Sequence, residues 1–275
     1  MGMPGRRFDY ASERERHERF VGRATLLDAS TRCSSTAKAT AGSPVWPHEL
    51  QWWWLGDTAA EDRLRVQIQT AIHRKALVLQ AASAMQLARI ACDRGDPAGL
   101  AEGARLVRLV AEDPRGGVFM TGLAYECWAR IELHERRPAT ELAARSRAVL
   151  AFAPLFSLGA TATLVRALVA EGQVADAVRV ADEGLAVIAE FGGAGYCEVD
   201  MRLAACEAFF AAGDRERCRA ELRGALHQIC IRAEDIEEPA WRRSYLTRNV
   251  ENRRARALAE EWGVTDPTSE FLSGP

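Results

Sequence analysis

Apolar residues recur at helical spacing along most of this chain, and the helical stretches come in pairs. Four segments each contain two such stretches separated by a short turn, at 88–107, 129–150, 165–188 and 206–229. Their turns align on Gly95, Arg136, Gly172 and Gly213, at spacings of 41, 36 and 41 residues. Recurrence at this interval is typical of helical repeats, in which each helix pair buries its apolar face against its neighbours.

Helix boundaries can be placed from the breakers and caps. Residues 59–94 contain no Gly or Pro and are too long for one ordinary helix, so we expect a break near 72–76. Asp96 followed by Pro97 predicts a helix start, because Asp caps the first turn and Pro suits the first helical position. Pro138, after the poorer cap Arg137, predicts another start. Alternating strand patterns with β-branched residues are absent, which predicts an all-α fold.

The two ends of the chain differ from its middle. Residues 1–58 include a Ser/Thr/Ala/Gly-rich stretch at 29–44 and a Trp-rich stretch at 45–57, and we expect this segment to be partly disordered. Its tryptophans either cover the first helix pair or form a contact surface for a partner. They are Trp46, Trp52, Trp53 and Trp54. We expect a helical repeat domain over 59–263 and a flexible tail over 264–275.

The repeated unit resembles the tetratricopeptide repeat. The likeness rests on the turn residue of each unit and on small residues where the helices cross. The third unit has Gly172, Ala177 and Gly184 at these places, and the fourth has Gly213, Cys218 and Ala225. The second unit keeps Ala129 and Ala148, and the first keeps Ala88 and Gly95. The resemblance implies an all-α, tetratricopeptide-like solenoid of antiparallel helix pairs, although the spacing departs from the regular 34 residues of that family.

A second resemblance lies in residues 239–262, PAWRRSYLTRNVENRRARALAEEW. They look like the closing segment of tetratricopeptide arrays in bacterial signalling proteins that carry a serine/threonine kinase or a regulatory ATPase. The stretch Arg19-Phe20-Val21-Gly22-Arg23 resembles the short F-V-G-R stretch that opens such ATPase modules. The phosphate-binding G-x-x-x-x-G-K-[ST] loop and the kinase H-R-D and D-F-G motifs are missing from this chain. The resemblance therefore implies the sensor end of such a protein without its catalytic module.

Composition narrows the class further. The 275 residues are 48% hydrophobic with a formal charge of −2, which argues against nucleic acid and anionic membranes as partners. No apolar run of bilayer-spanning length and no signal-peptide pattern occurs, so we expect a cytoplasmic location. The seven cysteines form no C-x-x-C pair, and we expect reduced thiols in the core. They are Cys33, Cys92, Cys127, Cys197, Cys206, Cys218 and Cys230.

The sequence contains no recognisable catalytic or metal-binding motif. The five histidines are scattered, and neither His48-Glu49 nor His134-Glu135 continues into H-E-x-x-H. The G-x-S-x-G nucleophile motif is absent as well. We therefore expect a protein that is not an enzyme and needs no cofactor and no metal. Cys–His catalysis by distant residues stays open, because sequence alone does not exclude it.

One set of residues stands in register on the first helices of successive units: Arg89, Arg130 and Arg166, with Glu207 in the fourth. In tetratricopeptide folds the first helices line the groove, so the arginines would form a ladder for an acidic peptide or a C-terminal carboxylate. The alternative is ordinary ion pairs within each helix, because Arg89 is followed by Asp93 and Arg130 is preceded by Glu126, each four residues away.

The sequence thus predicts a non-enzymatic scaffold for protein–protein interaction in a bacterial signalling or regulatory system. Its partner would be a protein or a peptide, an acidic one if the arginine ladder binds it. The first alternative is a remnant or subunit of a serine/threonine kinase or AAA-type ATPase regulator that lacks its own catalytic module. The second is an enzyme built in a helical core.

Overall fold

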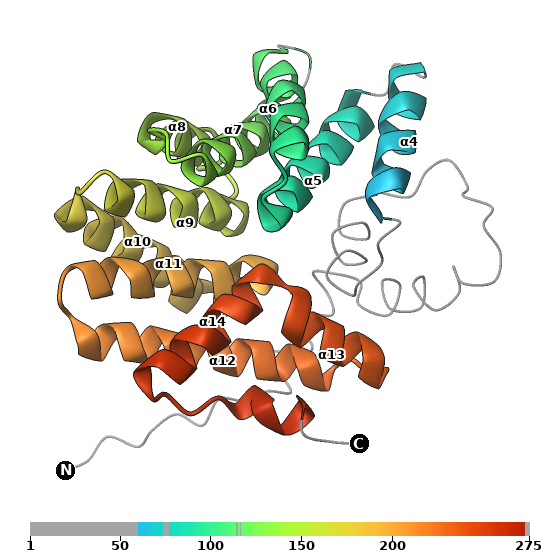
Figure 1. Ribbon diagram of the computed structural model, residues 1–275. Coiled ribbons are helices and arrows are strands. Elements are labelled where there is room, and N and C mark those ends of the chain that lie inside the picture. The colour runs from blue at the N-terminus through green and yellow to red at the C-terminus, as the bar shows by residue number, and fades with distance from the viewer. Residues whose placement is uncertain (1–59, 74–76, 114, 116, 273–275) are drawn as a thin grey trace. The chain divides into compact units, whose positions relative to one another are not determined.

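The computed structural model describes residues 60–272 except 74–76, 114 and 116 (Figure 1). The chain divides into two units, and all of the described residues lie in the second, Val45–Pro275. The expectations for the segment 1–58, including its tryptophans, lie outside the described residues. So do Cys33 and the last three residues of the chain.

The described residues are helical, with no strand among them, which confirms the all-α class. The helices are α4 (Ala60–His73), α5 (Leu77–Arg94), α6 (Pro97–Glu112), α7 (Gly117–His134), α8 (Thr140–Val149), α9 (Pro154–Ala170), α10 (Val174–Phe191), α11 (Glu198–Ala211), α12 (Arg215–Glu234), α13 (Pro239–Arg248) and α14 (Val250–Trp262), with 3₁₀ turns η1 (Gly195–Cys197) and η2 (Pro267–Leu272). The break expected near 72–76 falls between α4 and α5. Within the described ranges, no helix combines the length and apolar content of a bilayer span.

Consecutive helices pack in pairs, α5 with α6, α7 with α8, α9 with α10 and α11 with α12. The first helices of these pairs, α5, α7, α9 and α11, also contact one another in that order. α14 then packs on α11 and α12, so that it follows the last pair (Figure 1). This packing brings residues about 40 positions apart in sequence next to each other on neighbouring first helices.

The turn inside each pair has the same backbone conformation. Gly95, Arg136, Gly172 and Gly213 all have left-handed φ values, of 64°, 58°, 76° and 80°. This conformation satisfies the last carbonyls of a helix, and glycine adopts it with no steric cost. The alignment of the four turns in the sequence is therefore confirmed in three dimensions, including the one turn where arginine replaces glycine.

The small residues predicted at the helix crossings are mostly buried there. Gly184 of α10 lies so close to α11 that a Cβ would stand 2.6 Å from Met201 Sδ. Ala148 is an exception, because it is exposed. In the α7–α8 pair the buried contact is made by Ser146, whose hydroxyl donates to the carbonyl of Gly122 at 2.7 Å.

Two predicted boundaries differ from the structure. α8 begins at Thr140 rather than at Pro138, and its free amides at Ala139 and Thr140 donate to Glu171 Oε1 at 3.1 and 3.2 Å. Residues 267–272, expected within a flexible tail, form η2, which packs on α12 and α13. Phe271 contributes to this contact because its ring packs against the core.

Candidate functional site

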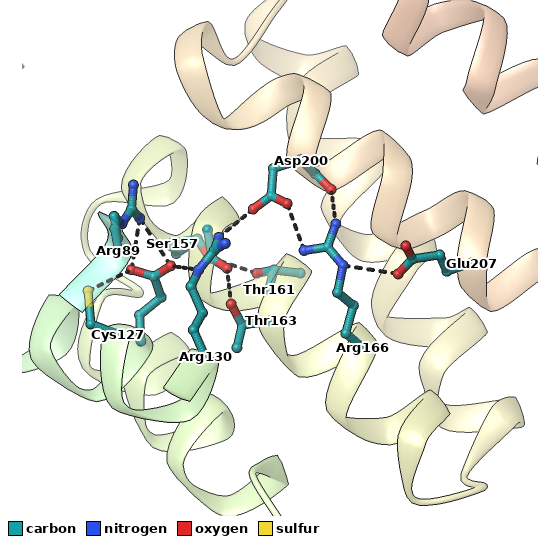
Figure 2. A network of polar contacts seen from close by, with 11 residues as sticks. Arg89, Cys127, Arg130, Ser157, Thr161, Thr163, Arg166, Asp200 and Glu207 are labelled. Atoms are coloured by element: carbon teal, nitrogen blue, oxygen red, sulfur yellow. Dashed lines mark hydrogen bonds and ion pairs between the residues drawn. The ribbon is translucent and has the colours of Figure 1, made fainter. Parts of the chain in front are cut away.

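The packing of the first helices brings the three predicted arginines into one row. Arg89 comes from α5, Arg130 from α7 and Arg166 from α9, and carboxylates from α7 and α11 lie between them (Figure 2). We call this set the charged row; it consists of Arg89, Glu126, Arg130, Asp200, Arg166 and Glu207. Positive and negative groups alternate along it, and each successive pair is joined by a hydrogen bond or an ion pair.

Glu126 joins the first two arginines. Arg89 Nη2 donates to both of its carboxylate oxygens, at 3.1 and 2.9 Å, and Arg130 Nε donates to Oε1. The Glu126 side chain is only 1% exposed. Burial by itself would raise its pKa, but the charges and hydrogen bonds of the two guanidinium groups lower the pKa below its ordinary value. Glu126 is therefore a fixed anion beneath the two arginines.

Asp200 joins the second arginine to the third. Arg130 Nη2 donates to Oδ2, and Arg166 Nη1 donates to Oδ1 at 2.6 Å. Arg166 Nη2 also donates to the backbone carbonyl of Asp200 at 3.2 Å. Burial opposes ionisation, yet the two guanidinium groups hold the pKa of Asp200 well below its usual range.

The row continues to α14. Arg166 Nε donates to Glu207 Oε2 at 3.0 Å, and Arg254 Nε lies 3.9 Å from Glu207 Oε1. Glu251, at the start of α14, lies beside the row and behaves differently from Glu126 and Asp200. Burial and the nearby charge of Asp200 raise its pKa, and the opposing charges of Arg130 and Arg166 do not cancel these effects. Glu251 thus takes up a proton more readily than an ordinary glutamate.

α9 passes beside the row without competing for its carboxylates. A Cβ added at Gly159 would lie 3.5 Å from Glu126 Oε1, which is an ordinary van der Waals distance. The hydroxyls of Thr161 and Thr163 donate to backbone carbonyls of their own helix, those of Ser157 and Gly159, both at 2.9 Å (Figure 2). Because these hydroxyls are satisfied within α9, they do not compete with the arginines for Glu126 and Asp200.

Exposure separates the arginines of the row from two of its carboxylates. Glu126 and Asp200 are 1% and 8% exposed, whereas the side chains of Arg89, Arg130 and Arg166 are 18%, 21% and 25% exposed. Glu126 and Asp200 therefore lie underneath the arginines, whereas Glu207 at the end of the row is 25% exposed, as Arg166 is. A molecule approaching this face meets hydrogen-bond donors first.

The neighbouring cavity is too small for a substrate. It has a volume of about 30 Å³ and is lined among others by Arg89, Arg130, Asp200, Arg232 and Glu251. Sites for small organic ligands typically have about 300 to 1,000 Å³. A larger hollow of about 440 Å³ lies between α14 and the segment before η2. It is open to solvent, no residue of the charged row lines it, and its Arg256 is paired with Asp266 at 2.9 Å. The cavity beside the charged row has room only for molecules of the size of water.

The chemistry of the site agrees with this geometry. Burial raises the pKa of Cys92 and of Cys127, two thiols close to Glu126, to about 12, so both are protonated and poor nucleophiles. Among the residues that the structure describes, no cluster of His, Cys, Asp and Glu side chains is suited to hold a metal ion. What the row offers is a set of positioned, charge-assisted hydrogen-bond donors.

The three arginines predicted from the sequence are thus neighbours, and the ion pair between Arg130 and Glu126 within α7 is present as well. The sequence reasoning missed Asp200 and Glu251, which come from helices 70 or more positions beyond Arg130. The sequence around Asp200 could have indicated its role, because Asp200 lies between the apolar residues Val199 and Met201 on a helix that is buried on most sides. A charge in such a place calls for a partner of opposite sign.

Comparisons with other proteins add no further assignment. Protein-family models, curated proteins and solved structures were compared with the chain, and none of them matches it. The packing of the helices and the charged row are therefore the features that indicate a function.

Proposed function

We propose that this protein is a non-enzymatic scaffold of a bacterial signalling or regulatory system, built as a tetratricopeptide-like stack of helix pairs. In this proposal a protein or peptide partner lies along the first helices and contacts the charged row. The observation that carries the proposal is the row itself, in which partly exposed guanidinium groups from α5, α7 and α9 stand above buried carboxylates.

Stability alone is a weak reason for such a row. Taking paired charges out of water costs about as much free energy as their attraction returns, so apolar residues would hold the helices together equally well. The stack has many such residues, for example the fully buried Leu158 and Val165 of α9. Charges aligned over several helices are better explained by recognition, for which complementary charge supplies specificity.

The row also indicates the chemistry of the partner. Arginine presents a planar fork of N–H donors that fits carboxylates and backbone carbonyl oxygens. Because Glu126, Asp200 and Glu207 formally balance the charges of the three arginines, the row is unsuited to densely charged polyanions. We propose a peptide segment whose acidic side chains or carbonyl oxygens accept hydrogen bonds from successive guanidinium groups.

An exposed aromatic cluster near the starts of α7 and α9 supports a function in protein–protein interaction. Phe119 lies edge-on to Phe152 and to Phe156, with ring centroids 6.3 and 5.0 Å apart. Phe152 is 64% exposed and Phe156 is 37% exposed. Aromatic side chains exposed together are more typical of protein interfaces than of other surface regions.

The test is affinity capture with matched arginine variants as bait. Arg166→Lys keeps the positive charge above Asp200 but removes the planar fork. Arg202→Lys is the control, because Arg202 is also paired with two carboxylates, Glu198 and Glu221, and is 21% exposed, but it serves the α11–α12 contact instead of the row.

We expect extracts of the source organism to yield a protein that the wild type and R202K retain and R166K loses. Titration of that purified protein should then show at least a tenfold weaker Kd for R166K, equivalent to about 1.4 kcal/mol. Equal capture by all three baits would contradict a role for the row. Capture of nothing above the bare resin would contradict the scaffold function.

A further inference from the structure

Two buried thiols meet between α11 and α12. Cys206 Sγ and Cys218 Sγ lie 3.0 Å apart, and the two residues are 0% and 1% exposed. Both are free cysteines in the structure. The helices that carry them are joined by the short turn around Gly213 and pack along their length. The thiols therefore stay together as long as this helix pair is folded.

We propose that Cys206 and Cys218 are an oxidative modification site, at which a peroxide oxidant forms an intramolecular disulfide that joins α11 to α12. The sulfur atoms need to approach by only about 1 Å to reach the ~2.05 Å of a disulfide bond. Cys127 and Cys230, in contrast, contact oxygen atoms, those of Met85 and Glu126 and of Glu234. The proposal goes beyond the scaffold function and does not depend on it.

The surroundings of the two thiols indicate which of them is oxidised first. Burial raises the pKa of both, but Cys218 lies in the first turns of α12, where Arg215 and Arg219 and the thiol of Cys206 favour its thiolate. For Cys206, burial is reinforced by Cys218 and Glu207, which raise its pKa further. Cys218 is therefore the thiol that reacts first.

The chemistry is balanced with hydrogen peroxide as the oxidant. The Cys218 thiolate attacks one peroxide oxygen, the O–O bond breaks, and the products are a sulfenic acid and hydroxide, which takes up the thiol proton as water. The sulfur of Cys206 then attacks the sulfenic sulfur, the S–O bond breaks, and a second water molecule leaves. In sum, two thiols and one peroxide give one disulfide and two waters. Because both thiols are buried, we expect this reaction to be slow.

The disulfide would constrain the helix pair next to the charged row. Glu207, which follows Cys206 in the chain, accepts the hydrogen bond from Arg166. A cross-link between residues 206 and 218 reduces the conformational freedom of the unfolded chain. We expect a thermal midpoint about 5 °C higher for the oxidised protein, lost again on treatment with dithiothreitol.

The experiment uses the full chain, treated with hydrogen peroxide, denatured in N-ethylmaleimide and digested with trypsin without reduction. The expected product is peptide 203–215 joined to dipeptide 218–219, two hydrogen atoms lighter than the separate peptides. Cys206→Ala and Cys218→Ala should each abolish this species and the rise in thermal midpoint. Cys230→Ala, a change at a half-buried thiol on the same helix as Cys218, should leave both unchanged.

The proposal is overturned if Cys206 and Cys218 are alkylated to the same extent with and without peroxide. It is equally overturned if Cys218 is found joined to another cysteine, or oxidised to sulfinic acid without a cross-link. Reversal by dithiothreitol is measured on the wild type, so this result does not depend on the folding of the alanine variants.

Discussion

Arg136 occupies a backbone conformation that suits glycine better than arginine. Its φ of 58° ends α7 in the way that Gly95, Gly172 and Gly213 end the first helices of the other pairs. For a residue with a Cβ, the left-handed conformation costs about 1 kcal/mol. The side chain of Arg136 is exposed, so little packing is lost when it is removed.

Arg136→Gly should therefore raise the free energy of unfolding by about 0.5 to 1 kcal/mol. Glycine removes the strain from the folded state, and this gain exceeds the loss that comes from the greater conformational freedom of glycine in the unfolded chain. Urea unfolding followed by circular dichroism measures the change. Gly213→Ala is the reverse control and should lower stability by a similar amount, because its φ is 80°. A lower stability for Arg136→Gly would show that the arginine side chain makes a favourable contact.

Asp200 of the charged row and Glu251 beside it have opposite effects on stability. The lowered pKa of Asp200 means that its contribution is present above pH ~4 and is lost as the pH falls through its folded-state pKa. The raised pKa of Glu251 means that folding gains from its protonation, a gain complete below its unfolded pKa and lost as the pH rises through the folded pKa. The same surface thus contains one stabilising and one destabilising anion.

Glu251→Gln should raise the thermal midpoint at pH 7, because the neutral amide avoids the cost of burying a charge and the repulsion from Asp200. The difference from the wild type should shrink toward pH 4, where Glu251 is mostly protonated in both states. Melting curves at pH 4, 5.5 and 7 measure this difference. A rise in thermal midpoint for Glu251→Gln that is the same at every pH would contradict a raised pKa of Glu251.

Asp200→Asn, which leaves Arg130 and Arg166 without their shared anion, should lower the free energy of unfolding by about 3 kcal/mol.

At the scale of helices, close crossings depend on single small residues. α10 meets α11 at Gly184, where an added Cβ would lie 2.6 Å from Met201 Sδ and 3.2 Å from Thr161 Cγ2. Met201 is fully buried and has little room to move aside. Gly159 of α9 is the matched case with space, since its added Cβ would lie at 3.5 Å or more from its neighbours.

Gly184→Ala should lower the free energy of unfolding by about 1 to 2 kcal/mol, because overpacking outweighs the better helix propensity of alanine. Gly159→Ala should leave stability unchanged or raise it by up to about 1 kcal/mol. Chemical unfolding of both variants measures the contrast. If the two substitutions changed the free energy of unfolding equally, the distance at the helix crossing would not explain the effect of Gly184→Ala.

At the scale of the whole described unit, the buried residues form two clusters. One extends from α7 and α9 through α14, and the other includes α4, α5 and α6 and also reaches α7. Since helix pairs contact chiefly the pairs next to them, we expect a local loss of stability to spread only to near neighbours. This expectation distinguishes a stack of repeats from one cooperative bundle.

Leu222→Ala in α12, at a fully buried position, should cost about 2 to 5 kcal/mol. Hydrogen exchange should then show lower protection in α11, α12 and α14 and little change in α5 and α6. Leu106→Ala in α6, a buried leucine of the other cluster, is the matched control and should give the reverse pattern. Equal loss of protection in all helices would contradict the neighbour-only coupling.

Much of the fold was readable from local patterns. The helical period of the apolar residues predicted the all-α class, and the four turns align as expected. Asp96 caps α6 as predicted, because its carboxylate accepts hydrogen bonds from the amides of Ala98 and Gly99. The start of α8 was misplaced because its cap, Glu171, comes from the following pair. A cap supplied by a distant residue leaves no mark in the sequence around the helix.

Where helices form and turn follows from the local sequence, since hydrogen bonding within a turn and glycine's access to left-handed φ act between near neighbours. The local sequence also places Arg89, Arg130 and Arg166 in register and Glu126 one turn before Arg130. The partners from other helices depend on tertiary packing, because Asp200 reaches Arg130 through the packing of α11 on α9 and α9 on α7. The pKa values of Asp200 and Glu251 likewise depend on burial and on charges from other helices, which no local pattern encodes.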